Sequence, residues 1–402
     1  MTARPDARTP LTSVEKIDIC RGLFAFLVVI AHAVDIAWAV HPSAPAALSR
    51  TAHDVWLYVV AAGVYWVIGF FVISGYCIQL SVERQVEGGR FPVGPYLIAR
   101  LSRILPLYYA ALASAVVFEW LMAPARPSTW PNGLDAGTLA AQLFVAQNFH
   151  QTFGSFAPSW SITNEMFYYV FFAGIVCVGL RLRVRPASLG MAACLALALG
   201  LEGAYFGWFR TDPVVRGLGL LFGLGTIWFQ GALVAVHREA LRRSPAARRI
   251  AAAWPLVLLL AVGLWYGRAV HMQVLYLVLG VAFTMMLARF VAVEPGDPRP
   301  VDRGRAGAAI RALGLASYPT YVFHGPFIMW LASALTRAGW LAGDWRLTWA
   351  ILSAVGIGSG LVLGYVAERP LMAWRAGMLR RLKAAERPAA APAPSPILGM
   401  PR

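Results

Sequence analysis

Residues 17–38 read IDICRGLFAFLVVIAHAVDIAW, a stretch that is apolar apart from four ionisable side chains. A helix of ~20 mostly apolar residues is long enough to cross the hydrocarbon core of a bilayer. Nine further segments have this character: 56–82, 97–122, 160–180, 188–208, 217–237, 252–268, 272–290, 312–336 and 346–367. We therefore predict an all-α, polytopic membrane protein with about ten transmembrane helices.

The composition excludes a water-soluble protein. Of the 402 residues, 59% are hydrophobic and only 13% are charged, whereas soluble domains carry about twice that charged share. The first apolar stretch is too long for the core of a signal peptide and lacks a cleavage site, so we expect it to remain as the first helix. The four cysteines fall within or near the predicted helices, and neither a disulfide nor a metal site is indicated.

The net charge of +16 reflects membrane topology and not nucleic-acid binding. The basic residues cluster between the apolar segments, and with the N-terminus inside, roughly four lie on the inner side for each one outside. Both termini are therefore predicted to be cytoplasmic. We expect a cytoplasmic segment over 1–16, a membrane domain over 17–370, and a basic and then Ala/Pro-rich cytoplasmic tail over 371–402 that is disordered.

The first span contains the clearest polar pair. Arg21 and His32 are eleven residues apart, about three helical turns, so they share one helix face, with His32 ~16 Å farther out. Asp35 follows one turn later, within reach of the imidazole. An ionisable side chain within a span costs roughly 3 kcal/mol and is a functional hypothesis by default. The alternative is that His32 only links helices through a hydrogen bond to a carbonyl.

The fourth span begins PSWSITNEMFYYVFF at residue 158. Glu165 is expected one to two turns below the outer interface, at the depth estimated for His32, so the two groups can meet. Ser161 and Asn164 are placed to hydrogen-bond a buried carboxylate. In the alternative interpretation a serine caps the helix and Glu165 is an acid of its first turn.

Small and basic residues mark the inner half of the second and third spans. Ser74, Gly75 and Tyr76 form a notch where a backbone or a ligand can approach closely. Arg100 and Arg103 lie one turn apart at the cytoplasmic interface, and guanidinium pairs bind phosphate well. Arginines at an inner helix end also follow from membrane topology alone.

The ninth span contains ASYPTYVFHGPFIMW from residue 316. It places His324 near the middle of the membrane, with Tyr318 and Tyr321 on neighbouring turns, while two prolines loosen the helix. A purely structural histidine is an equally good interpretation. Glu368, at the inner end of the tenth span, is expected to form a surface ion pair.

Taken in order, these motifs resemble the acyltransferase-3 family of bacterial membrane acyltransferases. The resemblance runs from about residue 14 to 370 and includes Arg21 and His32, FFVISGY, the Arg100 and Arg103 pair, the Glu165 motif and SYPTYVFHGP. The sequence departs from the family in reading IDICRG, where a Gly commonly precedes Leu-Arg-Gly, and SGY, where Phe usually follows SG. No part of it resembles the esterase-like domain that some members carry.

The resemblance implies transfer of an acyl group, usually acetyl, from cytoplasmic acyl-CoA to a hydroxyl of a cell-envelope carbohydrate or lipid-linked glycan. It also implies a multi-pass protein of the bacterial cytoplasmic (inner) membrane, with acetyl-CoA as co-substrate, no metal, membrane lipid around it and no nucleic-acid partner. We predict three groups of site residues: catalytic His32, Glu165 and Asp35; CoA-binding Arg21, Arg100, Arg103, Ser74 and Tyr76; and acceptor-binding His324, Ser161, Asn164 and Tyr321.

In this hypothesis neutral His32 removes the proton of the acceptor hydroxyl, with Asp35 or Glu165 holding the imidazole. Direct transfer and a covalent acyl-His intermediate both fit the residues. The main competing hypothesis is a proton-coupled transporter or flippase of a lipid-linked or acylated solute, with His32, Glu165 and His324 as a proton relay. The absence of an internal sequence repeat argues against it. A membrane scaffold is a third interpretation.

Overall fold

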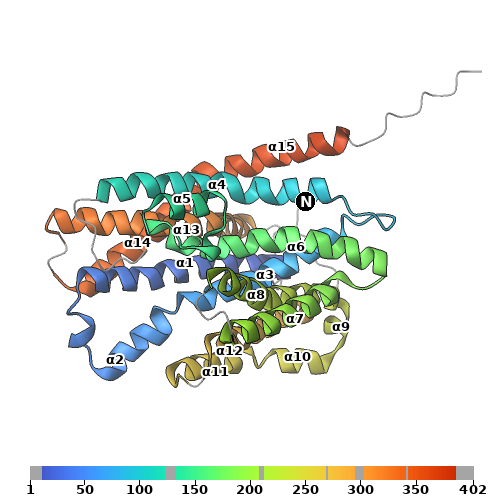
Figure 1. Cartoon of the computed structure of the whole chain (residues 1–402), viewed down its shortest axis with the longest axis horizontal. Helices are drawn as coiled ribbons and strands as arrows, with labels where there is room; N and C mark the ends of the chain where they lie inside the picture. Colours follow the sequence, from blue (N-terminus) through green and yellow to red (C-terminus); the bar gives the residue numbers. More distant parts are fainter. Residues whose placement is uncertain are drawn as a thin grey trace, which may run out of the picture.

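The computed structural model describes residues 11–122, 133–207, 212–268, 270–294, 303–340 and 343–385. Within these ranges the protein is a bundle of helices, with no β-strand (Figure 1). Each of the ten predicted spans falls in one helix or helical run: α1 Ser13–Val40, α3 Gly63–Glu83, α4 Val93–Met122, α6 Trp160–Leu182, α7 Pro186–Gly207, α8 Pro213–Val236, α11 Trp254–Tyr266, α12 Met272–Ala292, α13 Gly304–Arg337 and α14 Trp345–Leu363.

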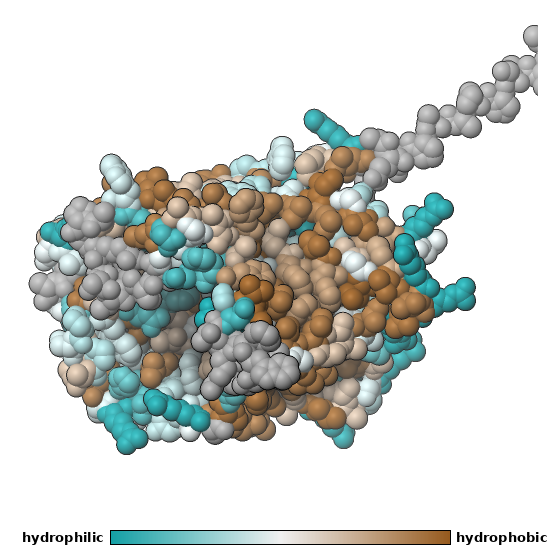
Figure 2. Space-filling model, viewed as in Figure 1, coloured by the Kyte–Doolittle hydropathy of each residue, from teal (hydrophilic) through white to brown (hydrophobic). Residues whose placement is uncertain are grey.

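Length and hydropathy support membrane insertion. Eight helical stretches of the described chain are long and apolar enough to cross a bilayer, and the helical stretch 186–201 is a shorter apolar one. Large apolar side chains also cover the outside of the bundle (Figure 2). On α11, for example, Leu256 and Leu259 are 68% and 66% exposed. Such a surface suits lipid and not water. The protein is therefore an all-α polytopic membrane protein.

Helix α15 (Arg369–Ala385) begins at the same end of the bundle as α1. Glu368, the residue before α15, interacts electrostatically with Arg21 in the early part of α1. The basic first part of the predicted tail is helical, because α15 extends to residue 385. The rest of that tail, 386–402, and most of the N-terminal segment, 1–10, lie outside the described residues.

Helices α1, α3 and α13 form the centre of the bundle. Helix α1 packs along α13, α14 and α3, and α3 packs along α8. The contact between α3 and α8 is unusually close: a Cβ on Gly75 would lie 1.8 Å from the carbonyl oxygen of Trp228, and one on Gly231 would lie 1.9 Å from that of Val72. The predicted small-residue notch at Gly75 is thus confirmed as a site of close helix packing.

Short helices connect the long ones. On one side lie α2 (Arg50–Val55), the π-helical η2 (Trp56–Val60), α5 (Ala136–Leu143) and the 3₁₀ turns η1 (Pro45–Ala47), η4 (Gln147–Phe149) and η5 (Gly154–Ser159). On the other lie α9 (Arg238–Arg243) and α10 (Pro245–Ala251), while a π-helical turn, η6 (Gly364–Glu368), joins α14 to α15. Segment η5 packs directly against α13 and leads into α6.

Candidate active site

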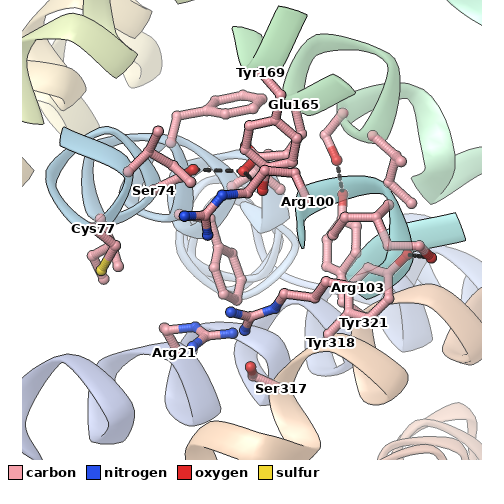
Figure 3. Close-up of a pocket in the computed structure, with 18 residues that line it drawn as sticks. Arg21, Ser74, Cys77, Arg100, Arg103, Glu165, Tyr169, Ser317, Tyr318 and Tyr321 are labelled. Carbon is pink, nitrogen blue, oxygen red and sulfur yellow. Dashed lines mark hydrogen bonds between the residues drawn. The ribbon is translucent and has the colours of Figure 1, made fainter. Parts of the chain in front are cut away.

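A cavity of about 180 Å³ lies inside the bundle, between α1, α3, α4, α6 and α13 (Figure 3). Aromatic and aliphatic side chains form much of its wall. Its charged and hydroxyl-bearing lining residues are Arg21, Ser74, Arg100, Arg103, Ser161, Glu165, Tyr169, Ser317, Tyr318 and Tyr321. Seven of the residues that we predicted as site residues therefore surround one cavity.

Three arginines face this cavity from two helices. In Figure 3 the guanidinium groups of Arg21 and Arg103 lie beside each other, with Arg100 farther along. Arg21 is 4.0 Å from Asp18, and Arg100 donates to Ser81 Oγ at 2.5 Å. Arg103 has neither a hydrogen bond nor an ion pair within the described part of the chain. Like charges repel strongly where water is scarce, so this cluster suits an anion with several negative oxygens.

Glu165 enters the same cavity from α6. Its Oε1 accepts hydrogen bonds from the hydroxyls of Ser74 and Tyr169, both at 2.5 Å. Trp228 of α8 donates its indole N–H to Ser74 Oγ at 3.1 Å. The close packing of α3 on α8 therefore positions Ser74, and Ser74 in turn holds Glu165 at the wall.

Two details of the predicted Glu165 environment are wrong. The carboxylate binds neither Ser161 nor Asn164: the Asn164 side chain is fully buried and donates to the carbonyl of Trp160, its own helix's first residue. The capping alternative also fails, because Ser159 makes no side-chain cap at the start of α6. Glu165 is instead part of a buried polar network between three helices.

His32 pairs with His324, and not with Glu165 or Asp35. The His32 Nδ1 and His324 Nε2 atoms are 2.9 Å apart, and the two rings stack with centroids 5.0 Å apart. His324 is 1% exposed, and its Nδ1 lies 2.6 Å from the carbonyl oxygen of Tyr321. Because a carbonyl only accepts, His324 carries its proton on Nδ1. In the neutral pair, His32 then donates from Nδ1, and its Nε2 makes no hydrogen bond to any other side chain that the structure describes.

The predicted common depth of His32 and Glu165 is also wrong. A Cβ on Gly63, at the start of α3, would lie 3.9 Å from the His32 ring, whereas Glu165 binds Ser74, eleven residues farther along α3. Eleven helical residues span ~16 Å. The cause is η5, which carries the chain into the bundle before α6 begins: its Ser155 carbonyl would lie 2.6 Å from a Cβ on Gly325.

Tyr321 connects the cavity to the histidine pair. Its hydroxyl donates to the Pro158 carbonyl oxygen at 2.8 Å and lies 2.6 Å from Ser161 Oγ, which must then be the donor. The same ring lines the cavity, and its centroid lies 5.9 Å from that of His324. The arginines and the histidine pair are thus linked through one side chain.

Besides Asn164, two predicted residues lie outside this arrangement. Tyr76 does not line the cavity, because two residues along a helix turn its side chain by about 200° from that of Ser74; it interacts with Glu294 and Ser13 instead. Asp35 is exposed and has no hydrogen bond or ion pair to any residue that the structure describes. Sequence reasoning in turn missed Tyr169, although its position four residues after Glu165 puts both on one helix face.

An all-α bundle with ionisable side chains around an internal cavity defines a polytopic membrane protein with an intramembrane site. A family model described as an acyltransferase domain matches residues 14–369, nearly the whole chain. The chain therefore belongs to the acyltransferase-3 family and is a membrane acyltransferase. No curated protein and no solved structure matches it.

Proposed function

We propose that the protein transfers an acyl group, acetyl in the simplest case, from cytoplasmic acyl-CoA to a hydroxyl of a cell-envelope carbohydrate or lipid-linked glycan. The observation that carries this proposal is the continuity of the site. Three arginines line one cavity, Tyr321 of the cavity wall packs against His324, and His324 binds His32.

The arginines are the binding site for the donor in this proposal. Arg21, Arg100 and Arg103 hold phosphate oxygens of CoA, since guanidinium groups match phosphate geometry and stay charged. The pantetheine arm then runs along the aromatic wall towards Tyr321. Glu165 is fixed by Ser74 and Tyr169, and its other oxygen can accept a hydrogen bond from an amide N–H of that arm.

His32 is the proposed general base. Its Nε2 removes the proton from the acceptor hydroxyl while the hydroxyl oxygen attacks the thioester carbonyl carbon. The C–S bond breaks, the ester forms, and the CoA thiolate takes up the proton from the imidazolium. Polarised by the hydrogen bond to His324, the ring gains and loses the proton at one nitrogen, as in other imidazole-assisted acyl transfers.

The arginines and the histidine pair lie at different depths along the bundle, which fits a donor and an acceptor that arrive from opposite sides of a membrane. The arginines lie towards the end of the bundle where α1 and α4 begin, and the histidine pair lies towards the opposite end, where α3 begins. In a bacterial cytoplasmic membrane with both termini inside, acyl-CoA enters from the cytoplasm. The acceptor hydroxyl arrives from the outer side.

The test is acetyl transfer by purified protein in nanodiscs, measured as CoA release and as acetyl ester formed on an added glycan acceptor. We expect His32→Ala to lower the rate by about 10²–10⁴-fold. His237→Ala is the matched control, because that histidine is exposed at the end of α8, and it should leave the rate unchanged. Full activity of His32→Ala at normal protein level contradicts the proposal. If the protein were a carrier, neither the wild type nor the variants would release CoA.

A further inference from the structure

Glu368 is a buried acid that this chemistry does not use. The expectation of a surface ion pair is wrong: the residue is 1% exposed. Its Oε2 has no hydrogen-bond partner among the residues that the structure describes. Burying a carboxylate without hydrogen bonds costs several kcal/mol, so nearby positive charge has to compensate for it.

That charge comes from the arginine cluster. The Glu368 carboxylate interacts electrostatically with Arg103 and Arg21, which line the cavity, and with Arg375 of α15. It also faces Tyr318, another residue of the cavity wall. Arg375 is itself tied to α4, where it donates to the carbonyl of Ala99, the residue before Arg100. Four helices thus bring positive or polar groups to one buried acid.

The backbone fixes Glu368 in this place. It ends η6, and a π-helical turn shifts the register of a helix by one residue, a feature frequent at functional sites. The turn begins at Gly364, where a Cβ would lie 2.8 Å from the backbone of Ala316 in α13. This close packing places the carboxylate behind the cavity wall, where it forms no direct ion pair with any residue that the structure describes.

We propose that Glu368 is a positioning residue that keeps the guanidinium groups of Arg21 and Arg103 together at the cavity. The two cations repel each other. The Arg103 side chain interacts at longer range with Asp18 and Glu165, but it has no hydrogen bond or direct ion pair in the described chain. A buried negative charge behind them offsets this repulsion. Without it, one long arginine side chain would turn towards the cytoplasm, and two-point binding of a phosphate-rich ligand would be lost.

This inference rests on the proposed function for the identity of the ligand, and the experiment separates the two. CoA and inorganic pyrophosphate are titrated into the purified protein in nanodiscs by calorimetry. We expect Glu368→Gln to weaken CoA binding about tenfold and to weaken pyrophosphate binding as well. Glu368→Asp keeps the charge and should recover much of the affinity. Glu83→Gln, which removes an acid paired with Arg238 at the inner end of α3, should bind like the wild type.

A double-mutant cycle distinguishes positioning from a general structural effect. If Glu368 acts through Arg103, Glu368→Gln has no further effect on CoA affinity in the Arg103→Gln background, although each single variant binds weakly. Additive losses, or unchanged or tighter binding in Glu368→Gln, overturn the proposal. Wild-type protein that binds pyrophosphate but not CoA refutes only the donor assignment, and wild-type protein that binds neither anion refutes both.

Discussion

At the scale of the residue, the position of one ring proton on His324 determines the tautomer of His32. The carbonyl of Tyr321 holds the His324 proton on Nδ1, and His324 Nε2 then fixes the tautomer of His32. In the proposed reaction, His324 therefore acts through His32, as a positioning residue. The pair lies between α1 and α13, so the position of the His32 Nε2 depends on how these two helices pack.

This predicts a specific kinetic signature for His324. In His324→Ala the His32 ring loses the acceptor that orients it, so kcat should fall by roughly 10–10²-fold, less than in His32→Ala. The KM for acyl-CoA should change little, because His324 does not line the arginine cavity. Steady-state kinetics at varied acyl-CoA measures both constants. Partial recovery is expected in His324→Gln, whose side-chain carbonyl can accept from Nδ1–H. A raised KM with normal kcat would instead place His324 in donor binding.

Sequence alone identified residues whose relation is local. Arg21 shares a face with His32, and Arg100 with Arg103, because helix periodicity fixes these relations. The contact between His32 and His324 joins residues 292 positions apart. Periodicity carries no information about such a pair, because it depends on which helices become neighbours in the bundle. Glu165 was assigned to the wrong partner for the same reason.

At the scale of the element, the contact between α3 and α8 positions the Glu165 network. Two glycines allow the backbones to touch, Gly75 on α3 and Gly231 on α8. Ser74 of α3 and Trp228 of α8 lie at this contact and are hydrogen-bonded to each other. A side chain at either glycine must push the helices apart.

We therefore predict that Gly75→Ala destabilises the protein by about 1–3 kcal/mol, the usual cost of overpacking. It should also lower activity, because Ser74 moves away from Trp228. Thermal unfolding in detergent and acetyl transfer measure the two effects. The control is Gly174→Ala on α6, where a Cβ meets no atom within 4 Å. If both variants unfold at the same temperature, the close packing is not needed for stability.

The helices could be predicted from the sequence because a helix that lies in lipid needs a long run of apolar residues, which hydropathy detects. All ten segments lie in helical stretches, with ends that differ by several residues. The depth of the start of α6 was misjudged, since η5, which comes just before it, packs inside the bundle. A short segment that packs on α13 has no periodicity to reveal it. The π-helical turn before Glu368 was missed for the same reason.

At the scale of the whole molecule, Glu294 ties the beginning of the chain to its later part. It follows α12 and accepts hydrogen bonds from the Ser13 backbone N–H at 2.9 Å and hydroxyl at 2.7 Å. Arg242 of α9 donates to its other oxygen at 2.5 Å. The N–H of Ser13 belongs to the first turn of α1 and has no partner within that helix. One carboxylate thus joins the start of α1, helix α9 and the end of α12.

This arrangement predicts how stability depends on pH. Burial alone would raise the pKa of Glu294, but the hydrogen bonds from Ser13 and the charge of Arg242 outweigh it, so the pKa lies below its ordinary value. The carboxylate therefore stabilises the fold fully above that ordinary value, and the contribution is lost as pH falls through the lowered pKa. At pH 7, Glu294→Gln should lose about 1.5–3 kcal/mol, typical of hydrogen bonds to a charged group.

The measurement is thermal unfolding in detergent from pH 7 down to pH 3 for wild type, Glu294→Gln and Glu239→Gln. The difference in unfolding temperature between the wild type and Glu294→Gln should become smaller as pH falls. Protonation removes the negative charge of Glu294 in the wild type, and the substitution has already removed that charge in the variant. Glu239 also contacts Arg242 but is 59% exposed, so Glu239→Gln should follow the wild type at every pH. If the difference in unfolding temperature between the wild type and Glu294→Gln stays constant with pH, the charge of Glu294 does not stabilise the connection between α1, α9 and α12.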